Sequence, residues 1–153
     1  MQILPDKMEP TSKTSSLNRH PSAFIHPSAV LDESVEVGPF CFIGPAVKIA
    51  ARTRLIASVT VLASTHIGSD CEIHPNVVLS GRPQVHGFKQ SPPDITKPLV
   101  VVGNKCTIRE FVSVHQSTAG PPTTIGDKVY IMTNAHVAHD CIVESNVTIV
   151  TGE

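Results

Sequence analysis

The chain has 153 residues, a size that fits one domain, and its formal net charge of -1 argues against a surface for nucleic acid or an anionic membrane. Hydrophobic residues make up 41% of the sequence but aromatic residues only 4%, which favours repeated layers of small aliphatic side chains over a mixed globular core. No apolar run approaches the roughly 20 residues of a membrane span.

The first 24 residues are polar and rich in Ser, Thr and Pro. They lack the apolar stretch of a secretory signal, and the acidic Asp6 and Glu9 make them a poor organellar transit segment. We therefore expect residues 1–24 to be a disordered extension and residues 25–153 to form one repeat domain.

An aliphatic residue recurs at every sixth position from Ile25 onward. This period is neither that of a helix nor that of a simple alternating strand. Each hexad is expected to form a short strand and a corner, with three hexads per turn and turns stacked about 4.8 Å apart. The expected fold is all-β, a parallel β-helix in the shape of a triangular prism. The aliphatic positions are Ile25, Leu31, Val37, Ile43, Ile49, Leu55, Val61, Ile67, Ile73 and Leu79, then Val102, Ile108 and Val114, then Ile125, Ile131, Val137, Val143 and Ile149.

The fourth residue after each aliphatic one is compact and is expected to point inward beside the corner. All four cysteines occupy this position, so we predict that they are buried small hydrophobes. Because they form no CxxC motif and are expected in distant coils, neither a zinc site nor a disulfide framework is predicted, and a reducing, cytoplasmic compartment is the default. The four are Cys41, Cys71, Cys106 and Cys141.

Two segments interrupt the repeat. Residues 86–101 contain three prolines and no hexad phase, and Gly120–Thr124 forms a second, shorter insertion. Both are expected to project from the prism. Insertions of this kind often carry ligand sites in solenoids, and a plain spacer loop is the alternative.

His139 and Asp140 form the first candidate for chemistry. A carboxylate beside an imidazole can orient it and stabilise its protonated form, which suits a general base near neutral pH. The hexad at Val114 lies three units before the hexad at Val137, so the two should stack in adjacent coils. His115 and His139 are therefore expected to be neighbours.

A further hexad over 85–90 would extend this face. It would stack against the hexad at Val114 and bring His86 and Lys89 beside His115, with His136 at the preceding corner. The remaining histidines are expected to be ordinary surface residues: His20, His26, His66 and His74.

Several segments resemble the UDP-N-acetylglucosamine acyltransferases, a hexapeptide-repeat family, over the N-terminal part of that family. The most specific is NAHVAHDC (134–141), and it is supported by IHPSAV (25–30), VGPFCFIGP (37–45) and IREFVSVHQST (108–118). The resemblance implies a left-handed coil and the transfer of a (3-hydroxy)acyl chain from acyl carrier protein to the 3-hydroxyl of UDP-N-acetylglucosamine, the first step of lipid A biosynthesis.

The resemblance also implies roles for single residues. His139 matches the general base and Asp140 its partner, while Lys89, His115 and His136 match positions that line the nucleotide-sugar site. It implies a homotrimer with sites between adjacent prisms, no metal and no cofactor beyond the acyl carrier protein that brings the acyl chain. The compartment would be the cytoplasm, or a mitochondrion or other organelle in a plant.

Some positions depart from the family pattern. Gly87 stands where an acidic residue is usual, and Gln116 stands where arginine is common. The chain also stops at Glu153, whereas in the family further coils and a helical C-terminal domain follow. We therefore expect weak activity and an open last coil that exposes aliphatic residues such as Val143, Val147 and Ile149.

Three alternatives remain open. Another hexapeptide-repeat acyl- or acetyltransferase shares the hexad phase, although NAHVAHDC argues against it. A non-catalytic trimeric scaffold would keep the prism without the chemistry. A γ-type carbonic anhydrase would bind zinc through histidines, but His136 and His139 are three residues apart, whereas that family places its close pair about five apart.

Overall fold

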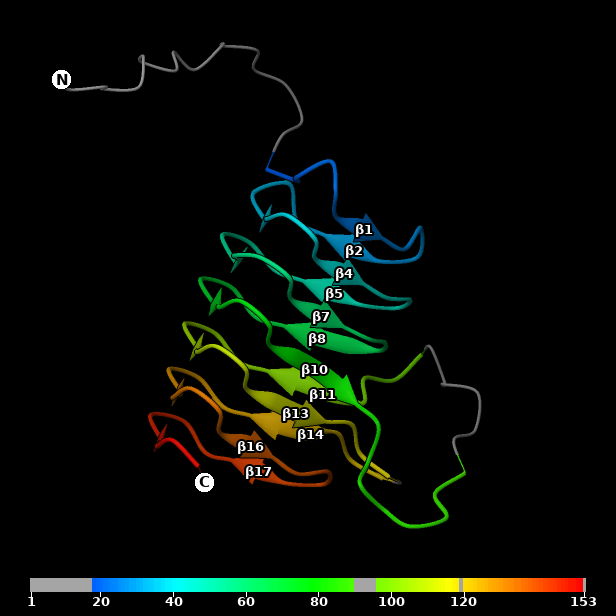
Figure 1. Ribbon diagram of the computed structural model, residues 1–153, viewed down its shortest axis with the longest axis vertical. Coiled ribbons are helices and arrows are strands. Elements are labelled where there is room, and N and C mark those ends of the chain that lie inside the picture. Colours follow the sequence, from blue (N-terminus) through cyan, green and yellow to red (C-terminus); the bar gives the residue numbers. More distant parts are fainter. Residues whose placement is uncertain (1–17, 90–95, 119, 153) are drawn as a thin grey trace, which may run out of the picture.

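The computed structural model describes residues 18–89, 96–118 and 120–152. In these residues the chain winds through three parallel six-stranded sheets, so that each strand pairs with the strand three further along. The result is a three-sided β-helix whose coils stack from top to bottom in Figure 1. None of the described residues forms a helix that is long and apolar enough to cross a membrane.

The first sheet contains β1 (Phe24–Ile25), β4 (Phe42–Ile43), β7 (Thr60–Val61), β10 (Val78–Gly81), β13 (Ser113–His115) and β16 (His136–Val137). The second contains β2 (Val30–Leu31), β5 (Lys48–Ile49), β8 (Thr65–Ile67), β11 (Val100–Val102), β14 (Thr123–Ile125) and β17 (Ile142–Val143). The third contains β3 (Glu36–Val37), β6 (Arg54–Leu55), β9 (Glu72–Ile73), β12 (Thr107–Ile108), β15 (Tyr130–Ile131) and β18 (Thr148–Ile149).

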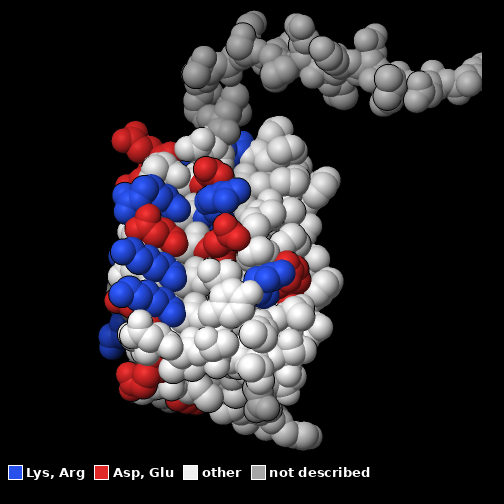
Figure 2. Space-filling model, turned by 90° about the vertical axis from the view of Figure 1, so that its left-hand side faces the viewer, with Lys and Arg blue, Asp and Glu red and all other residues white. Residues whose placement is uncertain are grey.

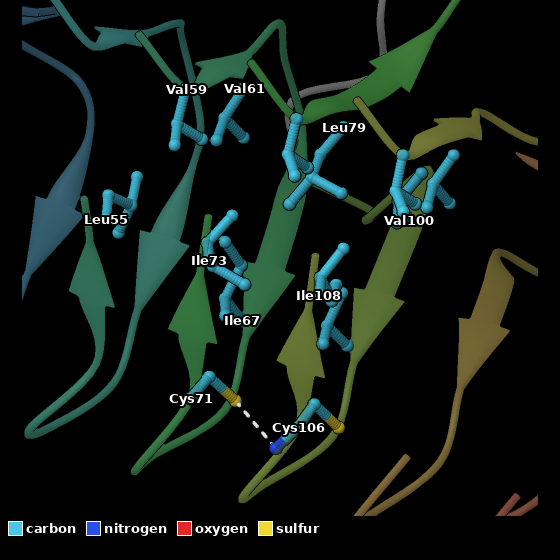
Figure 3. Packing of buried hydrophobic residues seen from close by; sticks show 14 of the residues in the cluster. Leu55, Val59, Val61, Ile67, Cys71, Ile73, Leu79, Val100, Cys106 and Ile108 are labelled. Atoms are coloured by element: carbon cyan, nitrogen blue, oxygen red, sulfur yellow. Dashed lines mark hydrogen bonds between the residues drawn. The ribbon is translucent and has the colours of Figure 1, made fainter. Parts of the chain in front are cut away.

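Each strand turns one aliphatic side chain into the prism and the preceding side chain outward. In β4, Ile43 is completely buried, whereas Phe42 is 38% exposed. Parallel pairing stacks equivalent hexad positions on each other, as in Ile25 opposite Ile43, so the core is a set of columns of aliphatic side chains (Figure 3). The predicted hexad positions are confirmed, and those in the first and last coils are the ones that are only partly buried: Ile25, Leu31, Val143 and Ile149.

The prism begins before Ile25. Arg19 forms a β-bridge with Val37, and the His20 backbone N–H donates to the Val37 carbonyl at 2.7 Å. The expected extension over 1–24 is therefore too long, because residues 18–24 already stack on the next coil. Residues 1–17 lie outside the described residues.

The cysteines only partly follow the prediction. Cys41, Cys71 and Cys106 are buried, but Cys141 is exposed because it precedes β17, the edge strand of its sheet. Cys71 and Cys106 are also not in distant coils. They stack at one corner, where the Cys106 N–H approaches the Cys71 sulfur at 3.4 Å (Figure 3). All four thiols are free.

The outer face of the third sheet carries a ladder of opposite charges. Arg54 lies between Glu36 at 3.0 Å and Glu72 at 3.3 Å, one coil to each side. A second column beside it pairs Arg52 with Asp70 at 2.7 Å. Figure 2 shows Lys, Arg, Asp and Glu side chains gathered on one part of its view, while the remainder of that view carries few.

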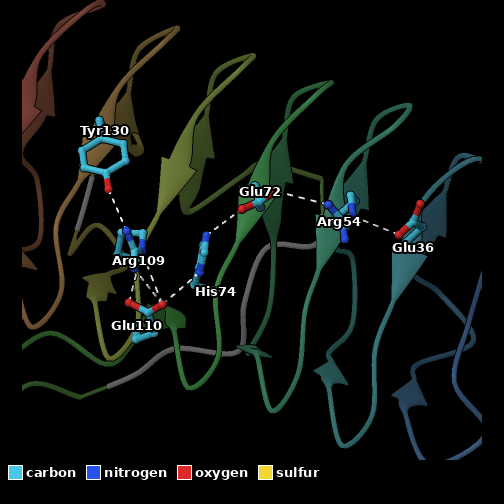
Figure 4. A network of polar contacts seen from close by, with 7 residues as sticks. All are labelled: Glu36, Arg54, Glu72, His74, Arg109, Glu110 and Tyr130. Carbon is cyan, nitrogen blue, oxygen red and sulfur yellow. Dashed lines mark hydrogen bonds and ion pairs between the residues drawn. The ribbon is translucent and has the colours of Figure 1, made fainter.

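His74 continues the ladder and is not the ordinary surface histidine that was expected. Its ring nitrogens lie 2.7 Å from Glu72 and 3.0 Å from Glu110, and the side chain is only 17% exposed (Figure 4). Arg109 in turn binds Glu110 and donates to the Tyr130 hydroxyl at 2.9 Å. The network therefore joins five successive coils across their outer face.

One corner of the prism, between the first and second sheets, is called the loop corner here. Both insertions leave the prism there and project on the same side in Figure 1. We call them the first excursion, which covers 82–99, and the second excursion, which covers 116–122; the expected bounds were 86–101 and Gly120–Thr124. The predicted ends were late because Val100 and Thr123 are compact inward residues that already belong to β11 and β14, and both are fully buried.

Candidate active site

His139 and Asp140 form the turn between β16 and β17, at the loop corner. His139 Nδ1 lies 2.7 Å from Asp140 Oδ2. Asp140 has a φ of 61°, a left-handed conformation that aspartate tolerates better than most residues. Because a carboxylate oxygen only accepts, the proton sits on His139 Nδ1 and leaves Nε2 as an acceptor. The geometry thus suits a base, while the catalytic role stays a prediction.

The carboxyl group of Asp140 is held by the second excursion. Thr118 donates to it twice, from its backbone N–H at 2.8 Å and from its hydroxyl at 2.6 Å. The Asp140 N–H in turn donates to the Thr123 hydroxyl at 2.9 Å. Burial tends to raise the pKa of Asp140, but the hydrogen bonds from Thr118 and His139 together outweigh it and hold that pKa below its ordinary value. Asp140 is therefore a carboxylate at neutral pH.

His136 and His115 lie close to this pair on the first sheet. Ser113 and His136 are direct partners on β13 and β16, and the Ser113 hydroxyl is 2.8 Å from His136 Nδ1. The rings of His115 and His136 meet edge to face, with centroids 4.5 Å apart. The structure therefore brings together the two histidines that the resemblance places in the nucleotide-sugar site.

His115 is the most enclosed member of the group, with 8% of its surface exposed. Burial, and then the nearby His136 and His139, lower the pKa of its imidazole. Its Nδ1 is buried without a hydrogen-bond partner among the described residues. Its ring edge packs against Gly81, where an added Cβ would lie 2.8 Å from His115 Cδ2. His115 is thus a neutral ring that packs against the end of β10, where the first excursion begins.

The condition for placing His86 and Lys89 on this face, a further hexad over 85–90, is not met. Leu79 in β10, rather than Val85, lies opposite Val114, and the register shifts by a bulge before Gly81. Val85 is 41% exposed. Ser80 has a φ of 63°, which bends the strand, and the chain leaves the prism after Gly81, the last residue of β10.

His86 and Lys89 therefore stand on the first excursion and not on the face of the first sheet. Both are exposed. Arg82 donates to the Phe88 carbonyl, and its guanidinium lies 5.8 Å from the centre of the Phe88 ring, so this part of the excursion folds back on itself. Lys89 is related to the histidines by position alone: its excursion leaves the prism at the loop corner, where the histidines also lie.

Sequence reasoning missed the residues that support the site. Thr118, Thr123 and Ser113 are hydroxyl residues among many, and their partners are 22, 17 and 23 positions away in the chain. The coil spacing was a usable signal, because it places the second insertion at the same corner as His139, one coil earlier.

No group of three or more His, Cys, Asp and Glu side chains that could hold a metal ion occurs within the described parts of the chain. His136 instead bonds to the Ser113 hydroxyl and His139 to the Asp140 carboxylate.

Comparison with known proteins confirms the resemblance. Residues 122–152 match the family model for bacterial transferase hexapeptide, six repeats. The chain is 43% identical over 84 residues to an acyl-[acyl-carrier-protein]–UDP-N-acetylglucosamine O-acyltransferase of Paraburkholderia phytofirmans, which is 53% of this chain and 30% of that protein. It matches a crystal structure of UDP-N-acetylglucosamine acyltransferase with 35% identity and a TM-score of 0.80, covering 87% of this chain and 50% of that one. The Francisella novicida enzyme matches with 31% identity and a TM-score of 0.77, covering 84% and 46%.

The chain thus spans about half the length of these solved structures, and the match to the curated relative covers 30% of it. The fold is the left-handed parallel β-helix of hexapeptide repeats that the resemblance implies.

Proposed function

We propose that this chain carries the base of an O-acyltransferase that moves a (3-hydroxy)acyl chain from acyl carrier protein to the 3-hydroxyl of UDP-N-acetylglucosamine. The observation that carries the proposal is the contact of 2.7 Å between His139 Nδ1 and Asp140, which leaves Nε2 free to accept a proton. The Paraburkholderia relative is named for acyl carrier protein and UDP-N-acetylglucosamine, and the two solved structures reported above are named for UDP-N-acetylglucosamine, which supports the choice of substrates.

In the proposed step, His139 Nε2 takes the proton of the sugar 3-hydroxyl as that oxygen attacks the thioester carbonyl. The new C–O ester bond forms, the C–S bond breaks, and the proton passes from the imidazolium to the departing thiolate of the carrier. Asp140 stays ionised, in keeping with its lowered pKa, and its carboxylate stabilises the imidazolium. A base placed in this way contributes about 10²–10⁴ in rate.

The neighbouring histidines and Lys89 would bind the nucleotide sugar. An imidazole can donate to or accept from a sugar or uracil group, and the ring of His136 is already oriented by Ser113. Lys89 is exposed on the first excursion, where an ammonium group suits a diphosphate.

A homotrimer is the assembly that we propose. The outer face of the first sheet is apolar in its first coils, where the rings of Phe24 and Phe42 stack with centroids 5.1 Å apart. Phe24 is 51% exposed, and Phe40 at the adjacent corner is 72% exposed. Exposed apolar surface of this kind is typical of an interface, and the same sheet carries His115 and His136. A second prism packed on this sheet would close the site.

The substrate test compares acyl donors and acceptors with the purified chain. We expect transfer from a 3-hydroxyacyl carrier protein to UDP-N-acetylglucosamine, detected as an acylated nucleotide sugar by mass spectrometry, and none to the 3-deoxy analogue. Transfer from acetyl-CoA instead would point to another hexapeptide-repeat transferase, and transfer to neither acceptor would contradict the proposal.

The assembly test is light scattering on the unmodified chain and on Phe42→Asp. We expect a mass of three chains for the first and a smaller mass for the variant, with Lys48→Asp on the second sheet as a matched control that keeps the trimer. A monomeric unmodified chain would contradict the trimer. The cytoplasm is the compartment that we propose, in keeping with the four free thiols.

A further inference from the structure

Thr118 makes the two hydrogen bonds that hold the carboxyl group of Asp140 from outside its own turn. Its N–H donates to Oδ1 at 2.8 Å and its hydroxyl donates to Oδ2 at 2.6 Å, so each carboxylate oxygen receives one bond. Oδ2 also receives the bond from His139 Nδ1 at 2.7 Å. Two donors from one residue fix both the place and the rotation of the carboxylate plane.

The bonds from Thr118 matter because, among the described residues, they are the ones that reach the Asp140 carboxyl from a neighbouring coil; the Thr123 hydroxyl binds the Asp140 backbone N–H instead. Its turn is exposed, its carboxyl is 38% exposed, and it precedes the edge strand β17. Exposed hydrogen-bonded pairs are weakly held on their own, since both side chains can rotate into water. A carboxylate fixed by a neighbouring coil can hold an imidazole in one orientation, whereas a free one cannot.

We propose that Thr118 is a positioning residue, through which the second excursion fixes Asp140 and thereby the ring of His139. This rests on the proposed function, in which His139 is the base. It also gives the second excursion a purpose: the chain leaves the prism after His115 and crosses the loop corner one coil before the pair that it orients. Thr118 acts through Asp140 and is not itself a catalytic residue.

The test uses an isosteric change, Thr118→Val, which removes the hydroxyl and keeps the backbone N–H. The matched control is Thr124→Val, because the Thr124 hydroxyl donates at 3.0 Å to the Pro122 carbonyl at the end of the same excursion and has no recorded bond to Asp140. Thr118→Ser keeps a hydroxyl and should therefore retain the properties that Thr118→Val loses. Thermal unfolding of each variant checks that the prism is intact.

The first measurement is NMR titration of the Asp140 carboxyl, which does not depend on activity. Loss of the Thr118 hydroxyl should raise the pKa of Asp140, because a hydrogen bond to the charged form is removed. Thr118→Ser should restore the pKa and Thr124→Val should leave it unchanged. An unchanged pKa in Thr118→Val, or an equal rise in Thr124→Val, would overturn the proposal.

A second measurement uses the unmodified chain, so the proposal stays open to refutation even if Thr118→Val does not fold. The amide proton of Thr118 should shift with the titration of Asp140, and this shift should vanish in Asp140→Asn. A chemical shift of the Thr118 amide proton that does not change as Asp140 titrates would refute the contact between them.

The third measurement is turnover. Thr118→Val should lower kcat by roughly 3- to 10-fold with KM nearly unchanged, which corresponds to the loss of one hydrogen bond. A rise in KM alone, with kcat intact, would overturn the positioning role. If the unmodified chain shows no acyl transfer, the proposed function fails, while the two NMR measurements still decide whether Thr118 fixes the pair.

Discussion

Ile108 offers a direct test of how the prism is stabilised. It lies in β12 between β9 and β15, and it is fully buried. Ile108→Ala removes three carbons, or about 2.4 kcal/mol at about 0.8 kcal/mol for each buried methylene, and the cavity left behind adds to the loss. We expect a decrease in the free energy of unfolding of about 3–4 kcal/mol. For a chain of this size that is roughly 10 °C in Tm.

The matched control is Ile149→Ala in β18. Ile149 occupies the same hexad position two coils later, but it is only partly buried because β18 is an edge strand. Its loss should cost about 1 kcal/mol, since less surface is removed from water. The assay is urea and thermal unfolding followed by circular dichroism at one fixed protein concentration. Equal losses at the two positions would refute the view that stability comes from stacking between neighbouring coils.

Three further changes test other parts of the structure. Gly81→Ala should lower stability by about 1–3 kcal/mol and break the His115–His136 ring contact seen by NMR, because its Cβ would meet the His115 ring; an unchanged Tm and ring contact would contradict this packing. Since the pKa of His115 is lowered in the folded chain from 6.5, the unfolded chain binds the proton more readily, so stability is complete above about pH 6.5 and falls as the pH drops below it. Tm measured at about pH 7.5 and 5.5 should show this fall, and His115→Gln should reduce it; an equal fall in the variant would contradict the assignment. Arg54→Met should cost only about 0–1 kcal/mol, and less in about 1 M salt, because its ion pairs are exposed; a salt-independent loss above about 2 kcal/mol would contradict it.

The hexad phase was sufficient to predict the core. It identified inward positions because each aliphatic residue meets an equivalent residue in the next coil, a purely local rule repeated along the chain. Cys141 shows where the rule stops: the residue type is right for the interior, but burial depends on a neighbouring coil, and β17 has one on one side only.

The insertions were harder to place. The residues VHGFKQ fit a hexad, yet Leu79 takes the place opposite Val114 and the chain departs after Gly81. Phase alone cannot tell a hexad in the stack from a chance match on a loop, because the difference lies in the backbone hydrogen bonds to other coils.

The candidate site could be predicted in its chemistry but not in its support. His139 and Asp140 are adjacent in sequence, so their pairing was visible. The bonds from Thr118 arise from two segments brought together by one turn of the prism and by the path of an insertion, and that path has no repeat to reveal it. The loop corner therefore brings together residues that are far apart in the sequence.

The most direct test of the account is the rate of acyl transfer in His139→Ala, compared with His20→Ala as a matched histidine change on the first coil. If His139 Nε2 is the base, the rate in His139→Ala falls by about 10²–10⁴ relative to the unmodified chain, while His20→Ala keeps its rate. A His139→Ala variant that transfers the acyl chain as fast as the unmodified chain would contradict the central claim.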